Sequence, residues 1–486
     1  MLHTQICIIG AGTSGMAAAY ALKDTGYQVI LVEKLPIPGG TAVNAWVETW
    51  IAGVNPPYLK EILRKDFRMG EEEISETVLL QRFSRICKEG ENCSLYLPRQ
   101  KMGGIYLRDM DAASNIQLLC GYLFLDACMQ GRRIISVRIQ NTTDSHDIRE
   151  IVADYFIDAS GNGDLAAYKG CLDVDYYLGE DPYDRFKESL APKIQFGQKE
   201  RIVKVNEPSL FFCVAESGNN GIVDEFTSVI PTKYKISPTS GFLYDGYNCG
   251  YWINSMTGMN LSGWAVVDAG EELSYGMAKE QIKSYWVFVQ EEVKRRIKEG
   301  KALYGYNERV FSQYPTGECA PMLGIREKRR IVCEYMLRQQ DLSVSASAAS
   351  LGRNIALGRH ELDFHTYGHL SAEKIGKFNK EQLRPSDIPY DCMIPQRFDN
   401  VLIACRSYGV SHIALSARRV NKDMAQLGWA AGKALAWCLD KRGATCDTRD
   451  VNVAELQSAD YTGFRDEMEY VENFLLKEEF KKESHA

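Results

Sequence analysis

Residues 5–33 read Gln5-Ile-Cys-Ile-Ile9, Gly10-Ala-Gly12-Thr-Ser14-Gly15, Met16-Ala-Ala-Ala-Tyr-Ala-Leu-Lys23 and, after a short polar stretch, Gln28-Val-Ile-Leu-Val32-Glu33. The two apolar runs predict β-strands, and the alanine-rich run between them predicts an α-helix. A glycine-rich loop that joins a strand to a helix is the usual cradle for dinucleotide phosphates. This stretch therefore predicts a β–α–β unit at the start of a Rossmann-like domain.

Each part of the loop has a mechanical role in such a unit. Gly10 allows the tight turn, Gly12 lets the backbone approach a pyrophosphate, and Gly15 lets the helix pack closely on the strand. Ser14 lies in the first helical turn, whose unpaired N–H groups face the phosphate. Glu33 stands where a carboxylate accepts hydrogen bonds from a ribose diol, which favours FAD or NAD over NADP.

The composition is that of an ordinary globular protein with a sizeable core. The chain has 486 residues, of which 45% are hydrophobic and 25% are charged. Its 57 basic and 64 acidic residues leave a net charge of −7, which argues against nucleic acid as the main partner. This length predicts two or three folding units.

The cysteine pattern and the apolar runs indicate the cellular compartment of the protein. None of the 14 cysteines forms a Cys-x-x-Cys pair, which argues against a redox dithiol, and the sequence predicts no metal site. No signal peptide is apparent at the amino terminus, and no apolar run reaches the length of a membrane span. We expect a cytoplasmic protein with free thiols and no membrane partner.

Two further glycine motifs decide between FAD and NAD. Lys34 is followed by Leu-Pro-Ile-Pro38-Gly39-Gly40-Thr41, and a predicted strand at 151–157 runs into Asp158-Ala159-Ser160-Gly161-Asn-Gly163-Asp164. A Pro-Gly turn alone would explain the first motif. Together with the amino-terminal unit, however, both resemble the FAD fingerprint of glutathione-reductase-like flavoproteins. The resemblance implies FAD contacts for Lys34, Gly40, Thr41, Ala159, Ser160, Gly161 and Asp164.

The carboxy-terminal half supplies a third element of the same fingerprint. Residues 399–406 predict a strand with a basic end, Arg406, and small residues from 428 to 434 predict a closely packed helix. The resemblance implies that Arg406, Gly428 and Ala431 lie near the flavin. The positive end of the helix dipole would stabilise the anionic reduced flavin.

Two other motifs extend the resemblance over residues 4–440. They are Gly324-Ile-Arg326-Glu327-Lys-Arg-Arg330-Ile and Leu362-Asp363-Phe-His365. With them the chain is similar to a family of FAD-dependent oxidoreductases that includes many bacterial flavoproteins, and more distantly to fumarate-reductase-type enzymes. This chain departs from that family's pattern at two places near the expected flavin face, where Cys405 replaces a glycine and Lys422-Asp423 replace a Pro-Thr-like pair.

The implied fold is an α/β fold, with a discontinuous Rossmann-like FAD-binding domain of glutathione-reductase type and an inserted α+β substrate domain. The expected FAD-binding segments are 1–45, 100–170 and 390–445, the substrate domain is 46–99 and 171–389, and a helical cap follows at 446–486. Within the substrate domain, residues 279–299 predict an amphipathic helix with Ile297 on its apolar face. Residues 464–482 predict a charged helix, and 214–221 a loop.

Four residues are candidates for the chemistry at the flavin. Arg326, at the start of an expected helix, would anchor a negative group, whereas Glu327 and Arg330 at i,i+3 would form a structural pair. Asp363 precedes His365 by two residues, so in an extended chain the acid would orient the ring. A buried, satisfied histidine is the alternative.

His412 completes the set because it follows the expected strand end at Arg406. That position suits a general acid or a substrate anchor. The substrate implied by these groups is a small organic molecule, possibly an anion.

The resemblance implies an enzyme that transfers a hydride between the N5 atom of FAD and its substrate. The chain lacks a second nucleotide loop, so FAD is expected to be the tightly held cofactor. One alternative is an FAD-dependent monooxygenase, and another is a non-catalytic or nucleic-acid-modifying flavoprotein scaffold, which the acidic balance disfavours. The sequence does not identify the external electron donor or acceptor or the oligomeric state.

Overall fold

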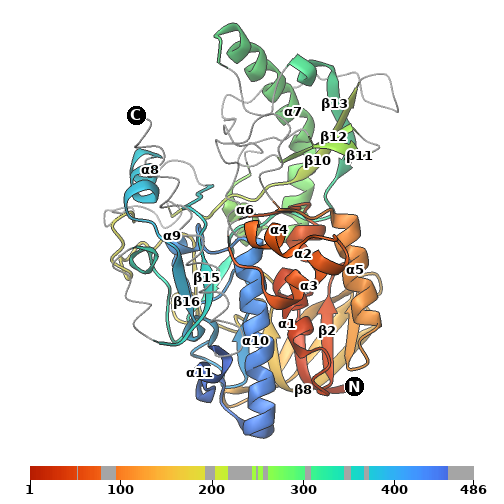
Figure 1. Cartoon of the computed structure of the whole chain (residues 1–486), viewed down its shortest axis with the longest axis vertical. Coiled ribbons are helices and arrows are strands. Elements are labelled where there is room, and N and C mark those ends of the chain that lie inside the picture. The colour runs from red at the N-terminus through yellow and green to blue at the C-terminus, as the bar shows by residue number, and fades with distance from the viewer. Residues whose placement is uncertain are drawn as a thin grey trace.

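The computed structural model describes residues 1–51, 53–77, 95–191, 203–216, 244–247, 250–254, 261–301, 308–343, 352–365 and 372–457. A large sheet with helices against it makes up the lower part of the molecule in Figure 1, and a smaller sheet with the long helix α7 makes up the upper part. A third group of short elements lies beside them. Among the described residues, no helix is long and apolar enough to cross a membrane.

The large sheet contains the strands predicted from the amino-terminal and central motifs. Its order is β5-β2-β1-β8-β7-β6, with β17 paired to β8. The members are β1 (Leu2–Ile9), β2 (Val29–Glu33), β5 (Ile116–Cys120), β6 (Tyr122–Gln130), β7 (Arg133–Asn141), β8 (Ile148–Asp158) and β17 (Val401–Ile403). The β5, β2, β1, β8 and β17 strands are parallel neighbours, whereas β6 and β7 form an antiparallel meander with β8. The core is thus the Rossmann-like α/β arrangement that the sequence predicts.

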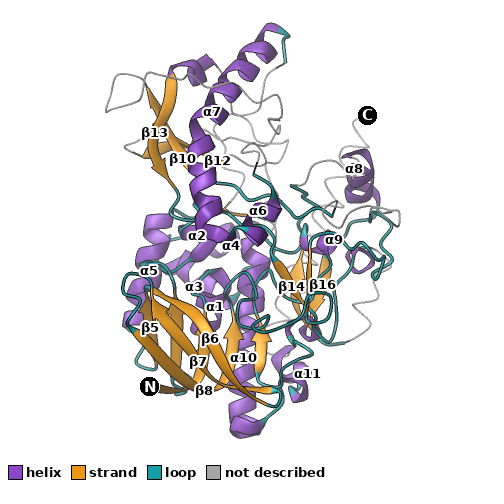
Figure 2. Ribbon diagram, turned by 180° about the vertical axis from the view of Figure 1, so that it is seen from behind, coloured by secondary structure: helices purple, strands orange, loops and turns teal. Residues whose placement is uncertain are grey.

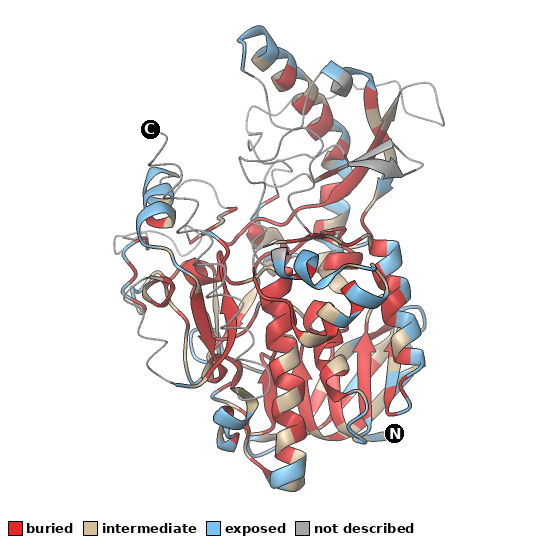
Figure 3. Ribbon diagram, viewed as in Figure 1, coloured by how far each residue is buried: buried red, intermediate tan, exposed pale blue. Residues whose placement is uncertain are grey.

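Two helices cover one face of this sheet, the face toward the viewer in Figure 1, and Figure 2 shows the opposite face. They are α1 (Thr13–Leu22) and α10 (Asn421–Lys441). Glycines bring them together, because a Cβ atom on Gly428 would lie 2.0 Å from the Ser14 carbonyl oxygen and one on Gly432 would lie 2.6 Å from that of Ala18. In Figure 3 helix α1 is mostly buried, and α10 is mostly buried except for intermediate positions and an exposed carboxyl end. The small residues at 428–434 therefore do pack a helix tightly.

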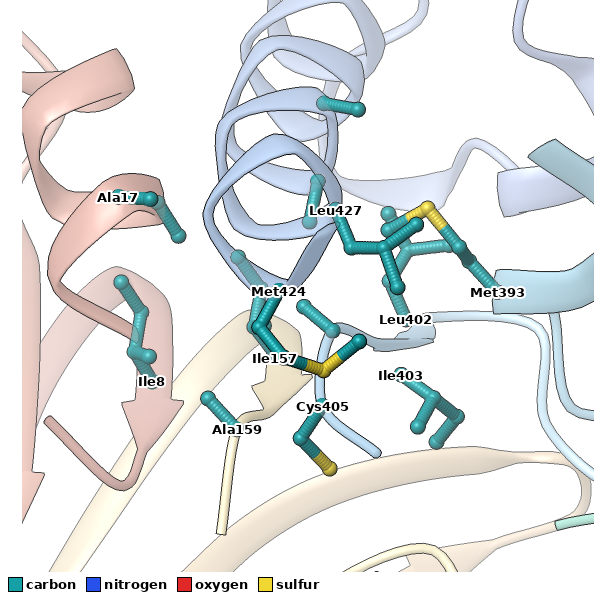
Figure 4. Packing of buried hydrophobic residues seen from close by; sticks show 14 of the residues in the cluster. Ile8, Ala17, Ile157, Ala159, Met393, Leu402, Ile403, Cys405, Met424 and Leu427 are labelled. Atoms are coloured by element: carbon teal, nitrogen blue, oxygen red, sulfur yellow. The ribbon is translucent and has the colours of Figure 1, made fainter. Parts of the chain in front are cut away.

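The apolar core lies between these helices and the sheet. Figure 4 shows Ile8 and Ile157 from the central strands, Leu402 and Ile403 from β17, and Leu427 from α10. The side chains of β15 (Asn354–Gly358) and β16 (Ser386–Pro389) join the same core. Buried residues between Ile331 and Ile388, expected in the substrate domain, thus share a core with the nucleotide-binding strands.

A second core forms around α7 (Gly270–Lys298) and an antiparallel sheet of order β11-β12-β10-β13. The strands are β10 (Phe211–Glu216), β11 (Tyr244–Tyr247), β12 (Gly250–Asn254) and β13 (Gln313–Cys319), and α6 (Gly263–Asp268) precedes α7. The predicted amphipathic helix is confirmed, but it begins nine residues earlier, at Gly270. Ile297, expected on the apolar face, is 37% exposed because it lies at the end of the helix, beyond the packed turns.

The expected helix at Arg326–Arg330 is wrong. Gly324 makes an isolated bridge with Ser209, and β14 (Arg329–Ile331) pairs with β9 (Tyr176–Leu178). The predicted Glu327–Arg330 ion pair does form, at 3.0 Å, between two fully buried side chains. The other buried side chains that contact Glu327 and Arg330 come from segments distant in the sequence. These tertiary contacts outweigh the i,i+3 spacing that favoured a helix.

Seven further α-helices and two further strands are present in the described residues, besides short 3₁₀ turns. They are α2 (Gly40–Val43), β3 (Thr49–Trp50), α3 (Pro57–Lys65), α4 (Glu71–Glu76), β4 (Leu95–Tyr96), α5 (Arg99–Asp111), α8 (Ala372–Glu381), α9 (His412–Leu415) and α11 (Val453–Leu456). The expected strand at 399–406 is shortened to Val401–Ile403. The expected helix at 464–482, and most of the loop at 214–221, lie outside the described residues.

Candidate cofactor and substrate cavity

A cavity of about 490 Å³ opens where the carboxyl ends of β1, β2, β8 and β17 meet the start of α10. This is the edge of a parallel sheet where ligands bind, and the volume is typical of ligand pockets. Figure 4 shows Ala159, Cys405 and Met424 gathered at this edge, and all three belong to the cavity wall. The cavity is therefore placed where the glycine motifs predict a dinucleotide.

The glycine loop is built to bring backbone close to a ligand. Gly10 has φ +98°, and a Cβ atom there would lie 2.4 Å from the Ala159 carbonyl oxygen. A Cβ atom on Gly15 would lie 1.8 Å from the Gly10 carbonyl oxygen, so this glycine is required by the packing of α1 on the loop. Gly12 differs, because the nearest atom to a Cβ there is the Gly40 Cα at 3.8 Å. Since Gly12 lines the cavity, its lack of a side chain leaves room for a ligand and not for the protein itself.

Glu33 is buried at the end of β2 and lines the same cavity. Its carboxylate accepts hydrogen bonds from the backbone N–H groups of Ala11, at 2.9 Å, and Leu35, at 3.0 Å. Burial raises the pKa of this carboxyl, and the two N–H groups oppose that rise. The N–H groups fix the carboxylate in the wall of the cavity, where it suits a ribose diol. The glycine loop and Glu33 together fit the adenosine diphosphate half of FAD.

A chain of four polar side chains links separate segments along the wall. The Lys34 ammonium donates to Glu271 Oε2 at 2.5 Å. The Asn162 amide donates to Glu271 Oε1 and accepts a bond from the Arg406 guanidinium at 2.6 Å. All four residues line the cavity. Three of them come from strand ends of the large sheet, whereas Glu271 comes from the first turn of α7.

Three charged side chains and one histidine from other segments also face the cavity. Arg326, Asp363, His365 and Arg419 belong to the wall. Asp363 Oδ2 lies 2.8 Å from His365 Nε2 and 3.2 Å from an Arg419 guanidinium nitrogen. Arg326 donates to the Glu207 carbonyl oxygen at 2.7 Å, which holds its side chain in place. The cluster carries two guanidinium groups and one carboxylate, so it is electropositive.

The Asp363–His365 pair sets the state of the imidazole. Burial, reinforced by the positive charge of Arg326, lowers the pKa of His365 to about 3, although Asp363 opposes the fall. The ring is therefore neutral near pH 7. Because Asp363 accepts at Nε2, that nitrogen carries the hydrogen and Nδ1 keeps its lone pair. The pair thus presents a proton acceptor and not a proton donor.

His412 is not on the cavity wall. Its Nδ1 lies 2.8 Å from Glu327 Oε2, and its ring packs against Phe364 at 5.7 Å. Glu327 also accepts from the backbone and the side-chain amide of Asn206. These partners, with Arg330, lower the pKa of the fully buried Glu327 to about 2 against the effect of burial. The arrangement gives His412 a structural partner behind the wall.

Most of the residues expected to contact FAD do lie on the wall. They are Gly10, Gly12, Ser14, Glu33, Lys34, Gly40, Thr41, Ala159, Ser160, Gly161, Asp164 and Arg406. Gly15, Gly428 and Ala431 are not part of it, and the first two pack helix α1 against its neighbours. Burial raises the pKa of Cys405 on the wall to about 12, so its thiol stays protonated.

Sequence analysis missed Glu271, Asn162 and Arg419 as wall residues. Asn162 sits inside a recognised motif, Ala159–Asp164, and could have been included. Glu271 carried no such signal, whereas Arg419 lies between the expected strand at 399–406 and the small residues at 428–434 but was not predicted as a site residue. Glu271 and Arg419 reach the cavity only because α7 and the segment before α10 fold against the sheet.

Comparison with known proteins supports the interpretation of this cavity as an FAD site. A family model described as FAD dependent oxidoreductase matches residues 5–459. No curated protein matches this sequence significantly.

Solved structures resemble the chain only distantly. A geranylgeranyl bacteriochlorophyll reductase-like protein from Thermoplasma acidophilum shares 11% identity, with 97% of this chain and 87% of that one covered and a TM-score of 0.42. A probable FAD-dependent monooxygenase, pqsL, from Pseudomonas aeruginosa shares 13% identity over 97% and 95% of the two chains, with a TM-score of 0.33. A myxobacterial FAD-dependent halogenase shares 15% identity and a TM-score of 0.26, and this chain spans 46% of its length.

The identities and scores of these structures are low, and the assignment does not depend on them. It rests on the family model, which covers nearly the whole chain, and on the agreement of the glycine loop, Glu33 and the cavity with an FAD site. The chain belongs to the FAD dependent oxidoreductase family and is an FAD-dependent enzyme.

Proposed function

We propose that this enzyme exchanges a hydride between FAD and a small organic anion, and that Arg326, Asp363, His365 and Arg419 form the substrate side of the cavity. The observation that carries the proposal is that one cavity wall holds both the glycine loop with Glu33 and this charged cluster. A cofactor in the loop and a substrate at the cluster would then share one cavity.

Bound FAD supplies a site at its N5 atom that takes or gives a hydride. The protein side chains bind, orient and manage protons. Two guanidinium groups favour a carboxylate or similar anion, since charge-assisted hydrogen bonds are about twice as strong as neutral ones. The neutral His365 ring offers Nδ1 as the acceptor for the proton that the substrate loses, and Asp363 partly offsets the cost that burial and Arg326 place on the imidazolium. This assignment favours the direction in which the substrate is oxidised.

His412 would then serve through its neighbours and not by touching substrate. Its partner Glu327 binds Asn206, and the Asn206 side-chain oxygen accepts the His365 backbone N–H at 3.0 Å. The chain His412–Glu327–Asn206 therefore supports the backbone position of His365. We assign His412 a positioning role.

The proposal includes the domain arrangement expected from the sequence. The large sheet carries the glycine loop, which supports a glutathione-reductase-type FAD domain interrupted along the chain. Ser209, Phe211, Asn254 and Arg326 reach the wall from the segments around the second core, which supports an inserted substrate domain. We place the centre of that domain within residues 203–325.

A ligand panel tests the proposal before the natural substrate is known. Oxidised enzyme is titrated with acetate, lactate, malate and benzoate, and with the neutral amide of each, while the visible flavin spectrum is recorded. We expect saturable spectral shifts with carboxylates and weaker or no shifts with amides. Arg326→Gln should weaken carboxylate binding at least about tenfold, because a hydrogen bond to a charged group contributes about 1.5–3 kcal/mol.

Arg353→Gln is the matched control, since Arg353 pairs with Asp391 and is not on the wall. Amides that bind as tightly as carboxylates, or an Arg326→Gln enzyme with unchanged affinity, would overturn the anion proposal. A ligand that reduces the flavin under anaerobic conditions identifies a substrate. A product that contains an oxygen atom from O₂ would instead make the enzyme a monooxygenase.

A further inference from the structure

Glu271 is the wall residue that comes from outside the predicted nucleotide-binding segments and ties two of them together. Its two carboxylate oxygens bind different partners, Lys34 after β2 and Asn162 after β8. Because Gly270 has φ +84°, the chain turns sharply there, and the first turn of α7 lies against the sheet edge. One side chain therefore ties the start of a 29-residue helix to two strand ends at the edge of the cavity.

The contacts place Glu271 near the adenosine side of the cavity. Lys34 follows Glu33 directly, and Glu33 is in register with Cys120 on β5. The chain then turns into Tyr122, Leu123 and Phe124, which also line the wall. Glu271 thus adds a carboxylate beside the residues that fit the adenosine half of FAD.

The electrostatics of the contact favour a held ion pair. Burial raises the pKa of Glu271, but Lys34, Lys328 and Arg406 outweigh burial and lower it overall. The Lys34 pKa is raised, because the attraction of Glu271, Asp164 and Glu33 outweighs burial. The side chains remain 40% and 27% exposed, so added salt reaches the pair and screens it.

We propose that Glu271 is a cofactor-retaining residue, which clamps the start of α7 over the FAD cavity through Lys34 and Asn162. FAD leaves the cavity only when this clamp opens, so the ion pair slows FAD release. The inference rests on the binding of FAD in this cavity, and it adds a role for α7 that the nucleotide motifs do not contain.

The rate of FAD release measures the clamp without any substrate. Holoenzyme is diluted into FAD-free buffer, and free FAD is followed by its fluorescence. Glu271→Gln should raise the release rate constant about three- to fivefold at low salt, as expected for a partly exposed ion pair with one extra hydrogen bond. Glu272→Gln is the matched control, because Glu272 is an exposed acid in the same helical turn and is not on the wall.

Salt and a double variant separate the clamp from a general loss of stability. Raising the ionic strength should speed release from the wild type and affect the Glu271→Gln enzyme less, so that the two rates converge. Lys34→Gln combined with Glu271→Gln should release FAD no faster than the faster single variant, because both changes break one contact.

The possible outcomes distinguish a failure of the clamp from a failure of the FAD assignment. Equal release rates for Glu271→Gln and Glu272→Gln, or additive effects of the Lys34 and Glu271 variants, would overturn the clamp. A wild-type protein that contains no FAD would overturn the assignment of the cavity instead. If Glu271→Gln is purified without FAD, its dissociation constant after reconstitution, compared with that of Glu272→Gln, gives the same test.

Discussion

Asp363 Oδ2 lies 2.8 Å from Nε2 of His365, which is two residues along the chain. Both side chains line the cavity whose wall also includes the glycine loop. The same oxygen accepts from Arg419. The carboxylate therefore fixes the imidazole tautomer and links it to a guanidinium group. We take this relationship as the centre of the proton chemistry.

Replacing Asp363 by Asn should lower turnover at least about tenfold, with FAD content unchanged. The Asn amide can turn its N–H₂ group to Nε2 and favour the other tautomer, and it has no charge to stabilise an imidazolium; the same change at the acid of a Ser-His-Asp triad lowers turnover by about 10⁴. Turnover of the substrate found in the ligand panel is the measurement. Asp391→Asn is the control, because Asp391 pairs with Arg353 and is not on the wall. Equal turnover in both variants would remove Asp363 from the proton chemistry.

The contact of α10 with α1 depends on the absence of a side chain at position 428. Gly428→Ala should destabilise the protein by about 1–3 kcal/mol or more, since the Cβ atom would lie 2.0 Å from the Ser14 carbonyl oxygen. Gly276→Ala in α7 is the control, because no atom of the described residues lies within 4 Å of its Cβ position. That change should stabilise the helix by about 0.5–1 kcal/mol. Thermal melts of both variants test the packing, and a Gly428→Ala protein as stable as wild type would contradict it.

Glu207 predicts a pH-dependent stability. Burial raises its pKa to about 8, against the opposing charges of Arg326 and Lys204, and within the described part of the chain its Oε2 has no hydrogen-bond partner. The folded state therefore holds a proton that the unfolded chain releases above its ordinary value of 4.5, so stability falls as the pH rises from about 4.5 to about 8. Glu207→Gln should remove this loss.

Melting temperatures at pH 5 and pH 8.5 measure the effect. The Gln variant should melt about 1–3 °C above wild type at the higher pH and close to it at the lower pH. The control variant Glu318→Gln, at an exposed position, should change neither melting temperature. A variant that melts below wild type at pH 8.5 would show that Glu207 is ionised and paired in the folded protein.

The nucleotide-binding unit could be predicted from the sequence because its determinants are local. Strand β1, the turn at Gly10, helix α1 and strand β2, which ends at Glu33, follow one another within one short stretch. The parallel pairing of β1 with β2 follows from their connection through α1. The Asp363–His365 contact is local too, since two residues separate its partners.

The other determinants are tertiary, which is why the sequence left them open. Glu271 and Arg419 reach the wall through the docking of segments far apart in the chain. The charged run at 326–330 was misread as a helix because its partners, Asn206 and His412, are distant in sequence. Gly428 was predicted to lie at the flavin, yet the shape of its surroundings shows that it serves helix packing.

The central claim is that FAD occupies the cavity at the glycine loop, and the flavin released from denatured protein tests it most directly. We predict FAD from the wild type and from Gly104→Ala, a glycine whose Cβ position has no atom of the described residues within 4 Å, and little or none from Gly12→Val. Gly12 has extended backbone with φ −69°, and the nearest described atom to its Cβ position is the Gly40 Cα at 3.8 Å, so a bulky side chain there blocks the ligand and not the fold. FMN or no flavin from the wild type, or full FAD in a folded Gly12→Val protein, would contradict the account.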